Sequence, residues 1–193
     1  MNRRSYEAVV IGASSGAIEA INTILPRLPE VFRLPVLIVV HLPPDHLSTL
    51  PELFQTRCVL PVKEAEDTES IQPGMIYIAP PDYHVLVEAD GRISLSSEEP
   101  VQYSRPSIDV LFETAADAYQ AALIGIVLTG ANSDGASGLR EIWKTGGTPI
   151  VQSPAEAQAP LMPESALAHC PAARVMTLNQ IASFLIDEGG SND

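Results

Sequence analysis

Short uninterrupted apolar runs alternate along this chain with segments whose apolar residues recur at helical spacing. The runs have the length and composition of strands that are buried on both faces of a sheet, as in parallel α/β proteins. Strands of this kind are expected at residues 8–11, 35–40, 75–79, 123–128 and 148–151. Helices are expected at 17–25, 46–55, 107–119 and 135–144, with one or two more after residue 163.

A hairpin interrupts this alternation. Residues 83–88 and 92–95 are predicted to be two strands joined at Asp90-Gly91, a pair typical of tight hairpin turns. We therefore expect a sheet that is not purely parallel throughout, and we expect the polar stretch 57–74 to be a loop. The pattern predicts an α/β fold with a doubly wound, mostly parallel sheet, helices on both faces and a β-hairpin, in one domain that covers residues 1–193.

Two helices allow predictions for individual residues. In the first helix, the 3.6-residue period predicts that one apolar face is shared by Ile18, Ile21, Ile24 and Leu25. Ser107 is expected to be the N-cap of the helix that follows it, with Asp109 in the first turn, where a negative charge is favourable.

Composition narrows the class of function. The 193 residues carry 11 Lys and Arg against 24 Asp and Glu, a net charge of −13, which argues against nucleic acid or an anionic membrane as the partner. No apolar run approaches the roughly 18 residues of a membrane span, and the N-terminus lacks a signal-type segment, so a cytoplasmic protein is expected. Cys58 and Cys170 form no CxxC pair, which predicts two buried free thiols, no disulfide and no metal site.

Candidate chemistry lies in three loops that follow buried strands, because ligands of open α/β sheets bind at the carboxyl ends of strands. The first loop, residues 12–16, matches G-x-S-x-G and places Ser14 at a sharp strand-to-helix turn beside a helix N-terminus. The alternative is a glycine-rich turn without chemistry. A dinucleotide loop fits less well, since G-x-G-x-x-G requires glycine where Ser14 stands.

The second and third loops supply a histidine and a carboxylate. His41 follows the strand at 35–40 and has the residue type of a general base, although a lone histidine is more often a packed or capping residue. Asp134 lies in the turn-rich stretch 129–135, either as the N-cap of the next helix or as the group that orients His41. The chain order Ser14, His41, Asp134 differs from the usual Ser, Asp, His of α/β hydrolases, so it indicates another triad arrangement or a coincidence.

Six segments in order resemble the catalytic domain of the CheB chemotaxis methylesterases, the protein-glutamate methylesterases. They are residues 10–16, 40–43, 76–81 with His84, 105–112, 128–130 with 133–136, and 146–147 with Gln152 and 162–163. The resemblance implies the doubly wound fold and a serine hydrolase that needs no cofactor or metal. It also implies a substrate, a methylated glutamate on the cytoplasmic helices of a methyl-accepting chemoreceptor, with deamidation of receptor glutamines as a further activity.

The same resemblance assigns roles to residues. It implies Ser14 as nucleophile, His41 as general base and Asp134 as the residue that orients the base. We therefore expect hydrogen-bond reach of about 2.6–3.2 Å, or somewhat looser without substrate, from hydroxyl to imidazole and from imidazole to carboxylate. Ala131 is the expected oxyanion donor through its backbone N–H. Ser15 is a further candidate for positioning the substrate.

Two other residues in the matching segments are further candidates. Arg105 is expected to bind substrate or to form a structural ion pair. His84 is expected in a hairpin strand, either as a packed residue or as a contributor to the site. In the Asp134 loop the family usually has Thr-Gly-Met-Gly, whereas this chain has Thr-Gly-Ala-Asn at residues 129–132.

Regulation and the rival functions stay open at this point. The family usually carries an N-terminal receiver domain, and the catalytic motif here starts near residue 9, which favours a stand-alone domain that is constitutive or controlled by a separate regulator. The alternatives are a non-catalytic α/β signalling or binding module and an esterase that acts on a different ester.

Overall fold

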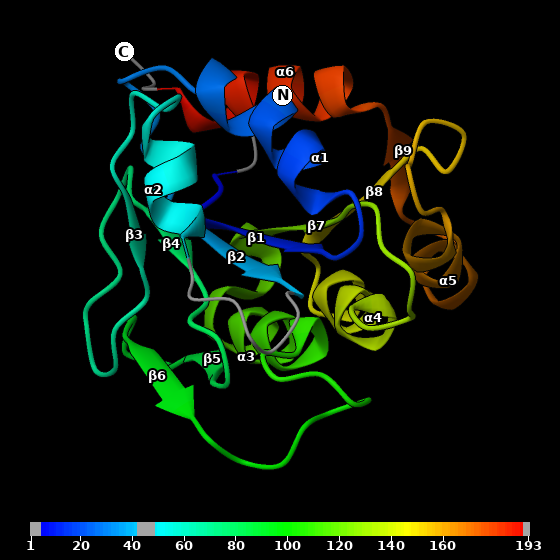
Figure 1. Cartoon of the computed structure of the whole chain (residues 1–193), viewed down its shortest axis with the longest axis horizontal. Coiled ribbons are helices and arrows are strands. Elements are labelled where there is room, and N and C mark those ends of the chain that lie inside the picture. The colour runs from blue at the N-terminus through cyan, green and yellow to red at the C-terminus, as the bar shows by residue number, and fades with distance from the viewer. Residues whose placement is uncertain (1–4, 42–48, 191–193) are drawn as a thin grey trace.

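The computed structural model describes residues 5–41 and 49–190. Its centre is a seven-stranded sheet of order β3-β4-β2-β1-β7-β8-β9, in which every described strand pair is parallel (Figure 1). The strands are β1 Ala8–Ala13, β2 Val36–Val40, β3 Val62–Glu64, β4 Ile76–Ile78, β7 Leu123–Val127, β8 Thr148–Gln152 and β9 Arg174–Met176. A separate antiparallel hairpin consists of β5 His84–Val87 and β6 Ile93–Ser96.

Helices cover both faces of the sheet, as predicted. One face carries α1, α2 and α6, and the other carries α3, α4 and α5 (Figure 1). The α-helices are α1 Ala17–Ile24, α2 Leu50–Gln55, α3 Ile108–Tyr119, α4 Ala136–Lys144, α5 Leu161–His169 and α6 Leu178–Gly189. Two short 3-10 helices are η1 Leu25–Arg27 and η2 Gln120–Ala122.

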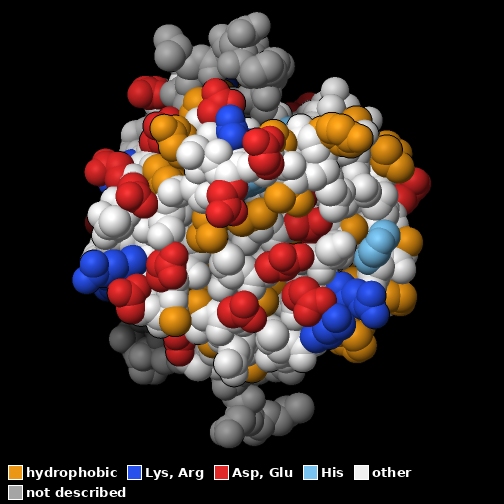
Figure 2. Space-filling model, turned by 90° about the horizontal axis from the view of Figure 1, so that it is seen from below, with side chains coloured by type: hydrophobic (Ala, Val, Ile, Leu, Met, Phe, Trp, Pro, Cys, Tyr) orange, Lys and Arg blue, Asp and Glu red, His pale blue; other side chains and the backbone are white. Residues whose placement is uncertain are grey.

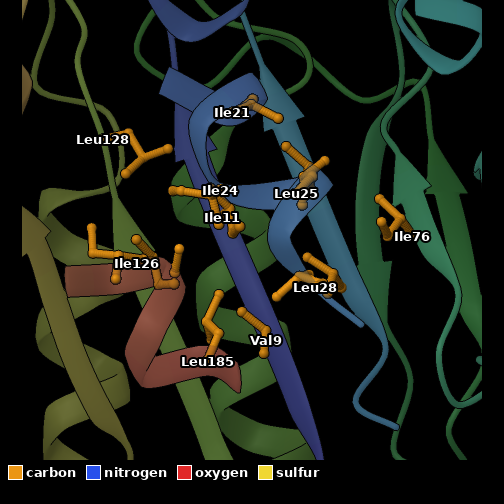
Figure 3. Packing of buried hydrophobic residues seen from close by; sticks show 14 of the residues in the cluster. Val9, Ile11, Ile21, Ile24, Leu25, Leu28, Ile76, Ile126, Leu128 and Leu185 are labelled. Atoms are coloured by element: carbon orange, nitrogen blue, oxygen red, sulfur yellow. The ribbon is translucent and has the colours of Figure 1, made fainter. Parts of the chain in front are cut away.

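The central strands separate two hydrophobic cores. Because successive side chains of a strand point to opposite faces, Val9 and Ile11 of β1 pack against α1 and α6, whereas Val10 packs against α3 and α4. Figure 3 shows the first core, where Ile24 of α1 and Leu185 of α6 lie over the central strands. Burial on both faces explains the continuous apolar runs that marked these strands in the sequence.

Several predictions of local structure need correction. The hairpin is a sheet of its own, so the main sheet is purely parallel in the described residues. The stretch 57–74 contains β3, and β9 was not expected; both are short edge strands without an apolar run. Of the helix expected at 46–55, α2 begins at Leu50, and positions 46–48 lie outside the described residues. Ile18 is 44% exposed, because Ala17, Ala20, Ile21 and Ile24 form the buried face of α1.

The surface reflects the excess of acidic residues. On the face shown in Figure 2, Asp and Glu side chains are spread widely, and the described Lys and Arg side chains gather in a few small groups. None of the helices in the described residues is long and apolar enough to span a membrane. Cys58 and Cys170 are free thiols in the interior, as predicted.

Candidate active site

The three candidate loops meet because the strands that carry them are neighbours. β1 pairs with β2 on one side and with β7 on the other, so residues 14, 41 and 129–135 leave the same edge of the sheet. The chain winds in opposite directions on the two sides of β1, which is the switch point where open α/β sheets bind ligands. Backbone hydrogen bonds join the loops, from Ser14 N–H to the Thr129 carbonyl at 2.9 Å and from His41 N–H to the Ala13 carbonyl at 3.0 Å.

The carboxylate of Asp134 is the most heavily bonded group of the site. It is 1% exposed and accepts four hydrogen bonds, from His41 Nε2 at 2.9 Å, Ser107 Oγ at 3.0 Å, Ile108 N–H at 2.6 Å and Asp109 N–H at 2.9 Å. Burial opposes ionisation, but the hydrogen bonds from His41 and from the two backbone groups outweigh it and lower the pKa of Asp134 below its ordinary value. This acid is therefore an anion at neutral pH.

These contacts correct two predictions about helix caps. Asp134 caps the N-terminus of α3, whereas the N-cap of α4 is Gly135. Ser107 does occupy the N-cap position of α3, but its hydroxyl donates to Asp134 and makes no capping bond to its own helix. A carboxylate from the other loop supplies the cap that Ser107 was expected to provide.

A second buried carboxylate links the same two helices in the opposite direction, from α3 to the N-terminus of α4. Asp109, in the first turn of α3, accepts from Gly138 N–H in the first turn of α4 at 2.7 Å and from Gln102 Nε2 at 2.8 Å. Burial raises the pKa of Asp109, with a further contribution from the negative charge of Asp134, against the opposing bond from Gly138. Asp134, which precedes α4, thus binds the N-terminus of α3, and Asp109 of α3 binds the N-terminus of α4. The pKa shifts of the two acids have opposite sign.

His41 has a partner on each ring nitrogen. Nε2 lies 2.9 Å from Asp134 Oδ2, and Nδ1 lies 3.0 Å from Asn132 Nδ2. Because ionised Asp134 only accepts, Nε2 carries the proton, and Nδ1 of the neutral ring accepts from the amide of Asn132. The side chain of His41 is 11% exposed and borders the groove that Ser14 also lines.

Ser14 lines a groove of about 640 Å³ together with His41, Ile18, Arg57 and Gln158. The serine follows β1 directly, and its carbonyl accepts from Ala17 N–H at 2.9 Å in the turn that starts α1. Among the described residues, no hydrogen bond joins the Ser14 hydroxyl to His41. The structure therefore brings histidine and carboxylate into contact and leaves the serine beside them on the same groove.

Hydrogen bonds of Thr129 hold the turn that contains Ser14 against the loop that follows β7. Thr129 N–H donates to Gln152 Oε1 at 2.8 Å, and the Thr129 hydroxyl donates to the Ser15 carbonyl at 2.8 Å. Gly16 is the N-cap of α1 and has φ +83°, where an L side chain is strained and its Cβ would meet Gln158. Ser15 and Ala131 are both exposed residues, in the loops that follow β1 and β7.

The remaining candidates have structural partners. Arg105 Nη1 donates to the carbonyls of Ser97 and Glu98 at 2.9 and 3.1 Å, rather than to a carboxylate, and thereby fixes the segment that follows β6. His84 is buried in β5, as expected; its Nδ1 accepts from Ser107 N–H at 3.1 Å, and its Nε2 lies 3.1 Å from the Glu99 carbonyl. His84 therefore supports the same N-cap residue that donates to Asp134.

Sequence reasoning missed Asn132 as a partner of His41 and Asp109 as a partner of Asp134. Asp109 lay in a matching segment and Asn132 in the loop that departs from the family pattern, but neither was given a partner, since their contacts depend on loops that meet only in the folded chain. Within the described ranges, no group of three His, Cys, Asp or Glu side chains is arranged to hold a metal ion.

The fold and this edge of the sheet define a doubly wound α/β protein of the hydrolase type, with a serine and a histidine on one groove and a buried aspartate bonded to the histidine. The chain belongs to the CheB methylesterase family, whose model matches residues 9–185.

Curated and solved relatives agree with this assignment. A protein of Leptospira interrogans, "putative protein-glutamate methylesterase/protein-glutamine glutaminase", is 48% identical over 182 residues, which cover 94% of both chains. A protein of Trichodesmium erythraeum with the same name, without "putative", is 37% identical over 93% of this chain and 52% of its own length. The crystal structure of the Thermotoga maritima CheB methylesterase catalytic domain is 33% identical, with a TM-score of 0.90 over 95% of this chain and 98% of that one. The chain thus spans about half the length of some relatives and nearly all of others.

Proposed function

We propose that this chain is a cytoplasmic serine hydrolase that removes methyl groups from glutamate methyl esters on chemoreceptors. The observation that carries the proposal is the His41–Asp134 pair beside Ser14, at the switch point of a CheB-family fold. The relatives' names support the reaction, and they add glutamine deamidation as a second activity to be tested.

The proposed mechanism follows from the bonding of His41. Asp134 occupies Nε2, so Nδ1 is the nitrogen that takes the proton of Ser14 as its oxygen attacks the ester carbonyl. Backbone N–H groups of the Ser14 turn and of Ala131 are proposed to hold the oxyanion. His41 then protonates the departing methanol, and water hydrolyses the acyl-enzyme by the same route.

The direct test measures methanol release from methylated receptor membranes. Ser14→Ala is expected to lower turnover by roughly 10⁴ to 10⁶, with residual activity from the oxyanion site. Ser94→Ala, on hairpin strand β6, is the matched control and should retain the wild-type rate. Release that survives Ser14→Ala would refute the proposal.

A second assay separates the rival functions. A serine-directed phosphonofluoridate is expected to label the wild type and not Ser14→Ala, whereas a non-catalytic binding module would not be labelled at all. Labelling without methanol release from receptor membranes would indicate an esterase for a different ester. Ammonia release from receptors that carry glutamine at the methylation positions tests the deamidase activity.

A further inference from the structure

The side-chain amide of Asn132 is hydrogen-bonded to His41 Nδ1, the nitrogen that accepts the Ser14 proton in the proposed mechanism. Its Nδ2 lies 3.0 Å from His41 Nδ1, whereas the Ser14 hydroxyl forms no hydrogen bond with the ring in the described residues. An amide nitrogen only donates, so this contact uses the acceptor lone pair of Nδ1. Nucleophile and base are therefore disconnected in this structure, with the asparagine amide as the competitor.

The direction of the Asn132 amide is fixed by a second contact. Its Oδ1 accepts from Asp134 N–H at 3.1 Å, the side-chain-to-backbone bond of an Asx turn, so the NH₂ end faces His41. The same bond ties the amide to the loop that holds the Asp134 carboxylate. Asn132 thus has two separable contacts, one that shapes the turn and one that reaches the imidazole.

The orientation of His41 does not depend on Asn132. Asp134 holds Nε2 at 2.9 Å, and the backbone N–H of His41 donates to the Ala13 carbonyl at 3.0 Å. Removal of the amide N–H would leave these anchors in place and free Nδ1. The main effect of the contact with Nδ1 is therefore competition for the lone pair, rather than support of the ring.

We propose that Asn132 is a positioning residue that gates the base, because its amide holds His41 Nδ1 until substrate displaces it and Ser14 takes its place. This inference rests on the proposed function, since it concerns the proton transfer from Ser14. In the resting protein the gate keeps Ser14 weakly nucleophilic. Release of the amide completes the contact from hydroxyl to imidazole to carboxylate.

Two substitutions of Asn132, one shorter and one isosteric, separate its contact with Asp134 N–H from its contact with His41 Nδ1. Asn132→Ser keeps an oxygen that can accept from Asp134 N–H but is too short to reach His41. Asn132→Asp keeps the acceptor for Asp134 N–H and replaces the donor at His41 Nδ1 with a carboxylate oxygen. That oxygen favours a proton on Nδ1, which then cannot accept one from Ser14.

The experiment measures the second-order rate of phosphonofluoridate labelling, which avoids any need for a receptor. In that reaction the bond from Ser14 Oγ to phosphorus forms, fluoride leaves, and the hydroxyl proton passes to His41 Nδ1. Asn132→Ser is expected to react roughly three to ten times faster than wild type, the factor set by one neutral hydrogen bond. Asn132→Asp is expected to react at least about ten times more slowly, since charge-assisted bonds are stronger.

A merely structural role of Asn132 would not give changes of opposite sign, because both variants keep the turn. Labelling of Asn132→Ser at or below the wild-type rate, with wild type itself labelled, would overturn the gate and leave the proposed function intact. Absence of labelling in wild type would overturn the proposed function and the gate together.

If the variants fail to fold, the gate is tested in the wild type by ¹⁵N NMR, which shows which nitrogen of the His41 imidazole carries the proton. The gate requires a proton on His41 Nε2 and none on Nδ1 at neutral pH, and a proton on Nδ1 would overturn it.

Discussion

Two neighbouring carboxylates are expected to respond unequally to the same substitution, with pH dependences of opposite sign. Asp134 and Asp109 are both buried, belong to facing helix ends and carry pKa shifts of opposite sign. Asp→Asn preserves size and removes the charge at either position. The comparison therefore tests whether the hydrogen-bond network, rather than burial alone, sets the stability of this edge of the fold.

Asp134→Asn should lower the free energy of unfolding by about 2–4 kcal/mol at pH 7. In the least costly orientation of the new amide, its oxygen still accepts from His41 and Ile108. The Ser107 hydroxyl turns so that it accepts from the new NH₂ group. The NH₂ group then faces the N–H of Asp109, and one buried unsatisfied donor costs about 1–3 kcal/mol. Loss of the anion from the N-terminus of α3 adds to this cost.

Asp109→Asn should change the free energy of unfolding by no more than about 1 kcal/mol at pH 7. The amide oxygen can still accept from Gly138 N–H. The Gln102 amide can flip, so that its oxygen accepts from the new NH₂ and its nitrogen donates to the Ser133 hydroxyl. The variant also avoids the cost of ionising a buried acid next to Asp134.

Urea unfolding at pH 7 and at a series of lower pH values that extends below 3.8 measures both effects. The folded pKa of Asp134 is lowered, so its contribution is complete above the ordinary value of 3.8 and is lost as pH falls through the folded pKa; the gap between wild type and Asp134→Asn should narrow in acid. The raised pKa of Asp109 has the opposite sign, so Asp109→Asn should gain on wild type as pH rises above 3.8. Equal losses for the two variants at pH 7, or a gap for Asp134→Asn that widens in acid, would refute this reasoning.

The other two predictions concern the helix pair and the buried thiols. Gly138→Ala should lower the free energy of unfolding by about 1–2 kcal/mol in urea, because the added Cβ would lie 2.5 Å from Phe112 Cβ and overpacking exceeds the gain in helix propensity; a more stable variant would contradict this. Burial raises the pKa of Cys58 from 9.0 to about 11, which lowers its thiolate fraction at pH 8 about a hundredfold, so iodoacetamide should modify it far more slowly in native protein than in urea; equal rates would show that the thiol is accessible.

The sequence predicted the central strands well because burial on both faces leaves a clear signal. Residues 36–40 and 123–127 are apolar without interruption, apart from one glycine, and both became interior strands. The edge strands carry no such signal. Val62–Glu64 is half-buried and Arg174–Met176 is largely exposed, so tertiary pairing with β4 and β8, rather than local composition, determines their conformation.

The position of the site could also be predicted, but its bonding could not. Three loops that follow adjacent parallel strands must leave the same edge of the sheet, which places Ser14, His41 and Asp134 near one another. That Asp134 caps a helix beginning 26 residues earlier, and that Asn132 takes the free nitrogen of His41, depends on side-chain distances set only by packing.

Asp134 both bonds His41 and caps α3, and this double role decides which variants can test for catalysis. A non-catalytic protein with this fold would still need Asp134, because three of its four hydrogen bonds hold Ser107 and the start of α3. Loss of activity in a variant of Asp134 is therefore ambiguous between chemistry and unfolding. Ser14 has no comparable structural role, because its hydroxyl lines the groove and has no protein partner among the described residues. The ring of His41 does support the fold, since it donates to the buried carboxylate of Asp134. A non-catalytic chain would gain no stability from the Ser14 hydroxyl, so Ser14→Ala, with an unchanged unfolding curve, is the variant whose loss of methanol release would identify an enzyme.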